Sequence, residues 1–251
     1  MSALSLAAAE DKSNHWAVLV AGSKGYGNYR HQADTCHAYQ ILKKNGIPED
    51  QIIHMNYDDV AHSIRNPKRG KLFNKPTKRG EPGVDVYEGC KIDYGNITAT
   101  STNFYKVMLG EENGDFPVLK TNEDSKIFLY YADHGGPGII GMPYLGGFNN
   151  TYIYADKLND TLTEMKQKKM FKEMTMYVEA CESGSMFQDI LDPSLNVYAV
   201  TAANATQPST GTYCGTHAMV DGVPILSCLG DLFSVNWMEN SDVAEMSTET
   251  L

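Results

Sequence analysis

The stretch KIFLYYADHGG, residues 126–136, is a continuous apolar run that ends in an acid, a histidine and two glycines. Such a run with turn residues behind it indicates a buried strand followed by a loop that begins at Asp133. The stretch TMYVEACES, residues 175–183, has the same pattern and reaches Cys181. Two strands of this kind, separated by an amphipathic stretch, predict parallel strands joined by a helical crossover. The expected fold class is therefore an α/β sandwich.

The rest of the chain alternates in the same way. We expect further strands at 15–23, 51–57 and 195–203, and helices at 32–44, 101–109 and 156–170. Segment 62–83 differs, because proline and glycine punctuate it and Lys and Arg dominate its charges. It predicts a long loop, either a solvated surface excursion or a contact site for an acidic partner.

Composition excludes several classes of function. The chain has 251 residues, with 21 Lys and Arg against 31 Asp and Glu, which gives a formal net charge of −10. A field of that sign repels phosphate backbones and anionic membranes, so neither nucleic acid nor a membrane is expected as a partner. The sequence has no apolar run long enough to span a bilayer. Residues 1–14 are interpreted as a tail or the remnant of a leader, and residues 15–251 as a single domain.

Three strand ends carry groups capable of chemistry. In parallel α/β sheets ligands bind beyond the carboxyl ends of the strands, and here those ends lead to residues 25–31, to His134 and to Cys181. A thiol needs a neighbouring imidazole to act as a nucleophile at neutral pH, and a backbone N–H at Gly135 or Cys181 can donate to an oxyanion. The competing interpretations are a cysteine that packs as a small buried hydrophobe and a His-Gly turn.

Motifs spread along the chain resemble those of a known family. The motifs are HWAVLVAGS, NYRHQAD with CHAYQILKKNGIP, YDD, NP, DVYEG with DY, YYADHGGPG, YVEACESGSM, VYAVTAAN and CLGDLFSVNWMENSD. Together they are similar to the plant-type legumains, the asparaginyl endopeptidases also called vacuolar processing enzymes. The resemblance implies a caspase-like fold with a mostly parallel central sheet of about six strands, and a cysteine peptidase catalytic domain over residues 15–251.

Carried over position by position, the resemblance assigns two sets of residues. Cys181 is the nucleophile and His134 the general base and acid, while Asn28 orients the imidazole and Gly135 contributes with Cys181 to the oxyanion hole. The pocket for the residue before the scissile bond, called the specificity pocket below, comprises Arg30, His31, Glu179, Ser209 and Asp231.

The chemistry of this pocket suits an asparagine side chain. A guanidinium matches the carboxamide oxygen, and carboxylates accept from its nitrogen. An ionised aspartate is rejected at neutral pH, and acidification is expected to admit its protonated form. The implied reaction is cleavage after Asn, or after Asp at acidic pH, through a thioester acyl-enzyme. Water resolves that intermediate in a peptidase, and an amine does so in a peptide ligase or transpeptidase.

Several further expectations follow from the resemblance. Asp133 is a candidate for dehydration to a succinimide. Cys214 and Cys228 match a bridged pair, against the alternative of two reduced loop cysteines, and Cys36 and Cys90 are assigned only to packing. No cofactor is implied, and no metal is expected, because the cysteines lack zinc-site spacings. Proposed partners are the C-terminal prodomain of the precursor and cystatin-type inhibitors, in a vacuole, a lysosome or outside the cell.

The chain also departs from the family pattern. Extra residues stand around Lys78 to Pro82 and at 146–150, and Thr210 with Gly211 replaces a bulkier wall of the cleft. Sequons at Asn96, Asn149, Asn159 and Asn204 weakly favour a glycoprotein of the secretory pathway. Two other functions remain open: a transamidase-type acyl transferase of the same fold and a catalytically inactive binding protein.

Overall fold

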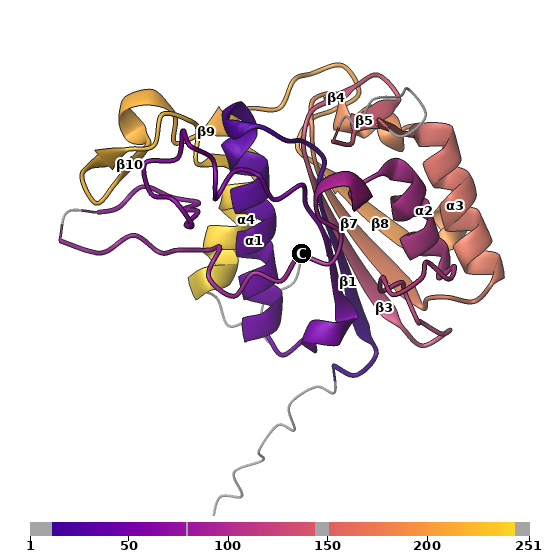
Figure 1. Ribbon diagram of the computed structural model, residues 1–251. Helices are drawn as coiled ribbons and strands as arrows, with labels where there is room; N and C mark the ends of the chain where they lie inside the picture. The colour runs from indigo at the N-terminus through magenta and orange to yellow at the C-terminus, as the bar shows by residue number, and fades with distance from the viewer. Residues whose placement is uncertain (1–11, 79, 144–150, 244–251) are drawn as a thin grey trace, which may run out of the picture.

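A five-stranded parallel sheet forms the centre of the molecule (Figure 1). The computed structural model describes residues 12–78, 80–143 and 151–243, so the predicted insertion at 146–150 and most of the tail lie outside the described residues. The strand order is β2-β1-β3-β7-β8, and every pairing is parallel. The strands are β1 (His15–Ala21), β2 (Ile52–Met55), β3 (Lys126–Ala132), β7 (Glu173–Glu179) and β8 (Val197–Thr201). The predicted α/β sandwich is confirmed, with five strands in its central sheet where about six were expected.

Four α-helices of the described residues cover the two faces of this sheet. Figure 1 shows α1 (Tyr29–Lys44) and α4 (Leu232–Val243) on one face, and α2 (Ser101–Leu109) and α3 (Ala155–Gln167) on the other. Helix α2 follows its sequence signals closely: the Thr100 side chain accepts from the Asn103 N–H, and Gly110 ends the helix at φ 64°. Helix α1 begins at Tyr29, three residues before the predicted start at residue 32. Its first turn therefore carries Arg30 and His31.

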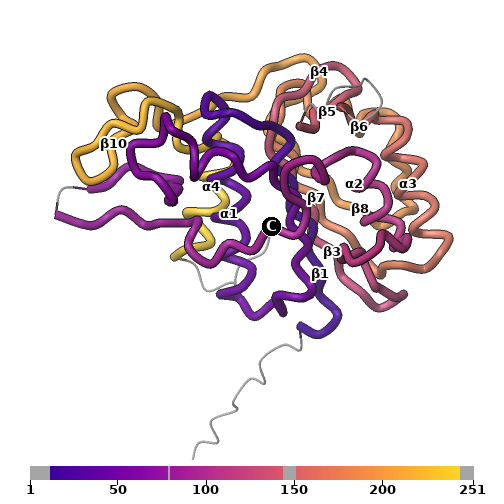
Figure 2. Tube along the Cα trace, viewed as in Figure 1, coloured from indigo at the N-terminus to yellow at the C-terminus, as the bar shows by residue number. Residues whose placement is uncertain are grey.

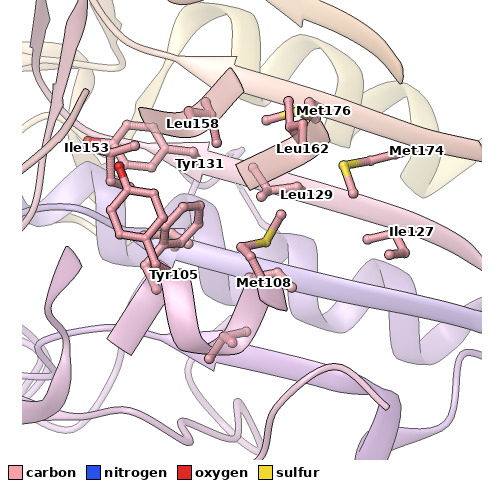
Figure 3. Close-up of a cluster of buried hydrophobic side chains, with 14 of the residues drawn as sticks. Tyr105, Met108, Ile127, Leu129, Tyr131, Ile153, Leu158, Leu162, Met174 and Met176 are labelled. Carbon is pink, nitrogen blue, oxygen red and sulfur yellow. The ribbon is translucent and has the colours of Figure 1, made fainter. Parts of the chain in front are cut away.

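Alternate residues of the central strands pack into two separate cores. On β3, Leu129 and Tyr131 face α2 and α3, whereas Tyr130 and Ala132 face α1 and α4. Figure 3 shows the first of these cores, where Met108 of α2 and Leu162 of α3 meet the methionines of β7. Burial on both faces explains why the strand sequences are continuous apolar runs rather than alternating ones.

Short strands lie beyond the carboxyl ends of β3 and β7 (Figure 2). β4 (Gly135–Gly136), β5 (Ile139–Gly141) and β6 (Tyr152–Tyr154) form a small antiparallel sheet. β9 (Gly211–Thr212) pairs with β12 (Gly230–Asp231), and β10 (Met219–Val220) pairs with β11 (Val223–Pro224). The β4-β5-β6 sheet and the β9–β12 pair lie at the sheet edge at which ligands bind in α/β folds, whereas β10 lies beside α1, away from the central sheet (Figure 2).

Segment 62–83 is a long loop, as expected, but part of it is built into the interior. Leu72, Phe73, Asn66 and Asn74 are all buried, at 2% exposure or less. The purely solvated interpretation is therefore wrong for the centre of the loop, and the contact-site interpretation stays a prediction. The half-buried Lys68 pairs with Asp221, and Arg79 lies outside the described residues.

Two disulfides cross-link the domain. Cys214 is bonded to Cys228, as the resemblance implied. Cys36 is bonded to Cys90, where the sequence suggested only packing. The two cysteines stand 54 residues apart, in α1 and in an irregular segment, so their spacing gave no signal. Within the described residues, no helix has the length and apolar character needed to cross a membrane.

Removing the Cys36–Cys90 bond should destabilise the fold more than removing the Cys214–Cys228 bond. The bonded residues are 54 and 14 positions apart. Loop-closure entropy gives about 4 kcal/mol for the longer loop and about 3 kcal/mol for the shorter one. Denaturant unfolding of Cys36→Ala/Cys90→Ala and of Cys214→Ala/Cys228→Ala, without reductant, measures both losses. Equal or inverted losses would contradict this expectation.

Candidate active site

His134 and Cys181 leave the central sheet side by side. Ala132 at the end of β3 pairs with Glu179 at the end of β7, so each of the two residues stands two positions beyond a register pair. The Asp133 N–H donates to the Glu179 carbonyl at 3.0 Å. The backbone contact continues at Gly135, where a Cβ atom would lie 2.4 Å from the Cys181 carbonyl oxygen.

Asn28 fixes the orientation of the His134 ring. Its Oδ1 lies 2.9 Å from His134 Nε2, and its Nδ2 donates to the Lys24 carbonyl at 2.9 Å. Because that second bond assigns Nδ2 as the donor, Oδ1 is the acceptor and Nε2 carries the ring hydrogen. His134 Nδ1 is then the basic nitrogen. Burial lowers the pKa of His134, and the charge of Asp133 only partly opposes this shift. The lowered pKa keeps the ring neutral at lower pH.

Cys181 is the free cysteine of the described chain, and it is partly buried. Its Sγ lies 3.9 Å from both the carbonyl oxygen and the Oγ of Ser209. The other four cysteines are bonded in pairs, so this thiol alone remains for chemistry among the described residues.

Arg30 and His31 share one carboxylate partner. Arg30 Nε lies 2.8 Å from Asp231 Oδ1, and His31 Nε2 lies 3.4 Å from Asp231 Oδ2. The opposite ring nitrogen of His31 meets Ser23 Oγ at 2.6 Å and Asp133 Oδ1 at 3.2 Å. The first turn of α1, the end of β3 and the strand β12 therefore meet at this cluster.

Glu179 is buried at 1% exposure and is held from the start of α4. Its Oε2 accepts from the N–H and the hydroxyl of Ser234, both at 2.9 Å, and Tyr130 donates to the Ser234 hydroxyl at 2.7 Å. Within the described residues, Glu179 Oε1 and Asp231 Oδ2 are buried without a donor at hydrogen-bonding geometry. Burial, reinforced by the charge of Asp231, raises the pKa of Glu179 to about 7.

A pocket of about 250 Å³ opens beside Glu179 and Ser209. Its other walls come from the segment before β9 and from the first turns of α4. Arg30 and Asp231 are not part of its lining, so the specificity pocket has two adjoining parts. The two parts meet where Gly211 of β9 pairs with Asp231 of β12. A Cβ atom added at Gly211 would lie 3.3 Å from Arg30 Cδ. Gly211 thus affects the polar part, and the neighbouring Thr210 is exposed.

Asp133 is also buried, at 5% exposure. Its carboxylate meets His31 and, more weakly, the Tyr131 hydroxyl at 3.4 Å. A Cβ atom at Gly141 would lie 2.3 Å from Asp133 Oδ2, so the side chain is closely confined. The succinimide stays a prediction.

In the described part of the chain, two clusters each bring three potential metal ligands together. One comprises Cys36, Cys90 and His54, and the other His31, Asp133 and His134. The disulfide consumes both thiols of the first cluster. In the second, the histidines are engaged by Ser23 and Asn28. Neither cluster presents a set of uncommitted donors.

Sequence reasoning missed the residues that support this site. Ser234 and Tyr130 hold Glu179, and Asp59 accepts from the Gly25 N–H at 2.8 Å, which anchors the loop that carries Asn28. Asp34 and Asn74 lie behind Asp231. Asp59 and Asp34 fall inside quoted motifs, whereas Asn74 stands in the basic loop with nothing to mark it.

Comparisons with known proteins place this geometry in context. The sequence profile of the Peptidase C13 family matches residues 15–251. The chain is 48% identical over 244 residues to the vacuolar-processing enzyme delta-isozyme of Arabidopsis thaliana, covering 96% of this chain and 50% of that protein. It is 44% identical over 246 residues to the legumain of Canavalia ensiformis, covering 96% and 50%. It is 45% identical over 249 residues to the vacuolar-processing enzyme of Phaseolus vulgaris, covering 98% and 48%. The chain spans about half the length of these relatives.

Proposed function

This chain belongs to the peptidase C13 family, and on that premise we propose that it is a cysteine endopeptidase that cleaves peptide bonds after asparagine. Cys181 is the nucleophile, His134 the general base and acid, and Asn28 the residue that orients the ring. The specificity pocket is formed by Arg30 and His31 together with Glu179, Ser209 and Asp231.

The observation that carries this proposal is the pairing of donor and acceptor groups in the specificity pocket. No donor among the described residues reaches Glu179 Oε1 or Asp231 Oδ2 at hydrogen-bonding geometry, although His31 Nε2 lies 3.4 Å from Asp231 Oδ2. The Arg30 guanidinium stands beside Asp231. A carboxamide supplies two N–H donors for the carboxylates and one oxygen for the guanidinium. A substrate without these groups leaves the buried oxygens unpaired, which is the basis of strong discrimination.

The proposed reaction proceeds in two halves. His134 Nδ1 takes the proton of the Cys181 thiol, and Sγ attacks the carbonyl carbon of the scissile bond. The backbone N–H groups of Gly135 and Cys181 donate to the oxyanion. The C–N bond then breaks, His134 gives its proton to the leaving amine, and a thioester remains. Water attacks the thioester carbonyl while His134 Nδ1 takes a proton from the water. The C–S bond then breaks, His134 returns that proton to Sγ, and the acid product leaves.

Selectivity between Asn and Asp should depend on pH through Glu179. The pKa of this group is about 7, so it is a carboxylate at high pH and gains a proton on acidification. A neutral Glu179 no longer repels an aspartate side chain and presents one acceptor fewer to asparagine. We expect the Asp/Asn ratio of kcat/KM to rise about tenfold or more between about pH 8 and about pH 5. Fluorogenic peptides that differ only in this residue measure the ratio.

Glu179→Gln is the matched variant, because it keeps the shape and removes the titration. The ratio for this variant should be flat between about pH 8 and about pH 5, and should rise only where the substrate aspartate itself takes up a proton, near pH 4. Equal rejection of aspartyl peptides by wild type at both ends of the range, in enzyme still active on asparaginyl peptides, would contradict the assignment. Absence of asparagine-dependent cleavage at every pH would remove the peptidase proposal.

The finer parts of the functional prediction are tested in the same assay. Transfer of the acyl group to an added amine would support the ligase or transamidase alternative over simple hydrolysis. The names of the relatives support a vacuolar location, and the lysosomal and secreted alternatives stay predictions. The prodomain and cystatin-type partners also stay predictions, since the chain spans about half of its relatives.

A further inference from the structure

A carboxyl group that the proposed mechanism does not use lies directly behind the specificity pocket. Asp34 is fully buried in α1, one turn after Arg30 and His31, so the three side chains project from the same side of the helix. Its Oδ2 accepts from the backbone N–H of Asp231 at 3.2 Å. Its Oδ1 accepts from Asn74 Nδ2 at 2.6 Å. Helix α1 therefore holds Asp231 at two points: Arg30 contacts the Asp231 carboxylate, and Asp34 accepts from the Asp231 backbone N–H.

Asn74 belongs to the long basic loop and is 2% exposed. Its Nδ2 also donates to the Leu229 carbonyl at 2.9 Å, so two acceptors fix which end of the amide faces Asp34. Its Oδ1 meets His37 Nδ1 at 2.8 Å, and His37 Nε2 meets Asp242 of α4 at 3.2 Å. A continuous line of hydrogen bonds runs from α4 through the loop to the backbone of Asp231.

Gly230, the residue before Asp231, leaves room for the side chains of Asp34 and Asn74. A Cβ atom at Gly230 would lie 2.9 Å from Asn74 Nδ2 and 3.1 Å from Asp34 Oδ1. The same Cβ would lie 2.4 Å from Val235 Cγ1 of α4, so a glycine before Asp231 lets both the pair and α4 approach the strand. Placing a third carboxyl beside Asp231 and Glu179 is electrostatically unfavourable, since each raises the pKa of Asp34 above its usual range in addition to burial.

We propose that Asp34 and Asn74 are a positioning pair that sets where Asp231 presents its carboxylate to the substrate side chain. Asp34 fixes the Asp231 N–H, and Asn74 fixes Asp34 and the carbonyl two residues before Asp231. The pair touches no substrate atom and acts only through Asp231. This inference rests on the proposed function, because it concerns the same pocket.

Asp34→Asn tests the pair directly. An asparagine at position 34 has one acceptor oxygen for the two N–H groups that Asp34 accepts, those of Asn74 and Asp231, so one of the two contacts is lost and the hold on β12 weakens. We compare kcat/KM for peptides that carry Asn or Ala immediately before the scissile bond. Losing one buried hydrogen bond should lower this Asn/Ala ratio by about tenfold. The loss should appear mainly in KM for the asparaginyl peptide, since the pocket binds substrate and transition state alike. Asn74→Asp places two carboxylates face to face and should lower the same ratio.

The double variant Asp34→Asn/Asn74→Asp restores a donor opposite an acceptor. Its selectivity should exceed that of Asn74→Asp, which a general loss of stability does not predict, while the lost bond to the Leu229 carbonyl keeps it below wild type. The matched control is Asp93→Asn, because Asp93 Oδ2 accepts from the His54 N–H of β2 at 3.0 Å, far from the pocket in strand order. That control should leave the Asn/Ala ratio unchanged. Active enzyme is counted by titration of the Cys181 thiol.

The outcomes separate this inference from the proposed function. Wild type that cleaves after Asn, with an unchanged ratio in folded Asp34→Asn, overturns the positioning pair and leaves the peptidase proposal intact. A double variant no better than Asn74→Asp also overturns it. Wild type with no asparagine-dependent cleavage removes the proposed function instead. If Asp34→Asn does not fold, Asn74→Ser carries the test, with an expected loss of selectivity of about threefold, and an unchanged ratio again overturns the pair.

Discussion

Replacing Cys181 by alanine is expected to lower kcat/KM for an asparaginyl peptide by about a thousandfold or more, because no other group can form the thioester. The other cysteines of the described chain are bonded in pairs and lie outside the site. The thiol is partly buried and carries no structural bond stronger than its 3.9 Å contacts to Ser209. Thermal unfolding should therefore change little while steady-state cleavage disappears.

Thiol counting supplies a control that does not depend on activity. Native wild type should react with one equivalent of an alkylating reagent at the cysteines the structure describes, and Cys181→Ala with none. Loss of substrate cleavage on alkylation of wild type should match the extent of labelling. A Cys181→Ala protein that keeps activity near that of wild type would falsify the nucleophile assignment.

Replacing Gly135 by alanine is the second change with a large expected effect. The added Cβ would lie 2.4 Å from the Cys181 carbonyl oxygen and 3.0 Å from Ala180 Cβ, so the two strand ends must move apart. That movement displaces the backbone N–H groups proposed as the oxyanion hole. Loss of one such donor costs about a hundredfold to a thousandfold in kcat. Overpacking adds a loss of stability of about 1–3 kcal/mol, which denaturant unfolding measures.

Gly136→Ala is the matched control for this prediction. A Cβ there meets only Ile139 side-chain atoms, at 3.6 and 3.8 Å, which are ordinary contacts. The variant changes the same residue type in the same strand β4 and should keep kcat within about threefold of wild type, since it displaces no proposed donor. Similar losses in both variants would indicate that β4 tolerates no side chain at all, and the oxyanion assignment would lose its support.

Strands and strand ends were predictable because burial leaves a direct trace in the sequence. β3 was predicted with its observed bounds, since both of its faces pack against helices and every residue of the run is constrained. The shared register of β3 and β7 then follows from the parallel arrangement, which is what brings His134 and Cys181 together. The start of α1 was placed too late, because Asn28 and Tyr29 follow a glycine-rich loop that hides the first turn.

Supports of the site were not predictable, because they depend on contacts between distant segments. Asn74 reaches Asp34 across 40 positions and Leu229 across 155. Cys36 of α1 is bonded to Cys90 of an irregular segment 54 positions away. In each case the local sequence specifies a loop or a helix, and the partner is chosen by the tertiary fold. The basic loop therefore concealed a buried amide, that of Asn74, which contacts Asp34 behind Asp231.

The burial of that loop also bears on self-digestion. An endopeptidase that cuts after asparagine encounters its own chain at high local concentration, and long surface loops are preferred sites of nicking. Asn66 and Asn74 stand in such a loop, yet each is 2% exposed. Asn66 donates to the Ala61 and Lys71 carbonyls, so both asparagines are fastened by their own side-chain amides. The side-chain amides that a peptidase of the proposed specificity would need to bind are already hydrogen-bonded, so we expect this loop to resist autolysis while the domain stays folded.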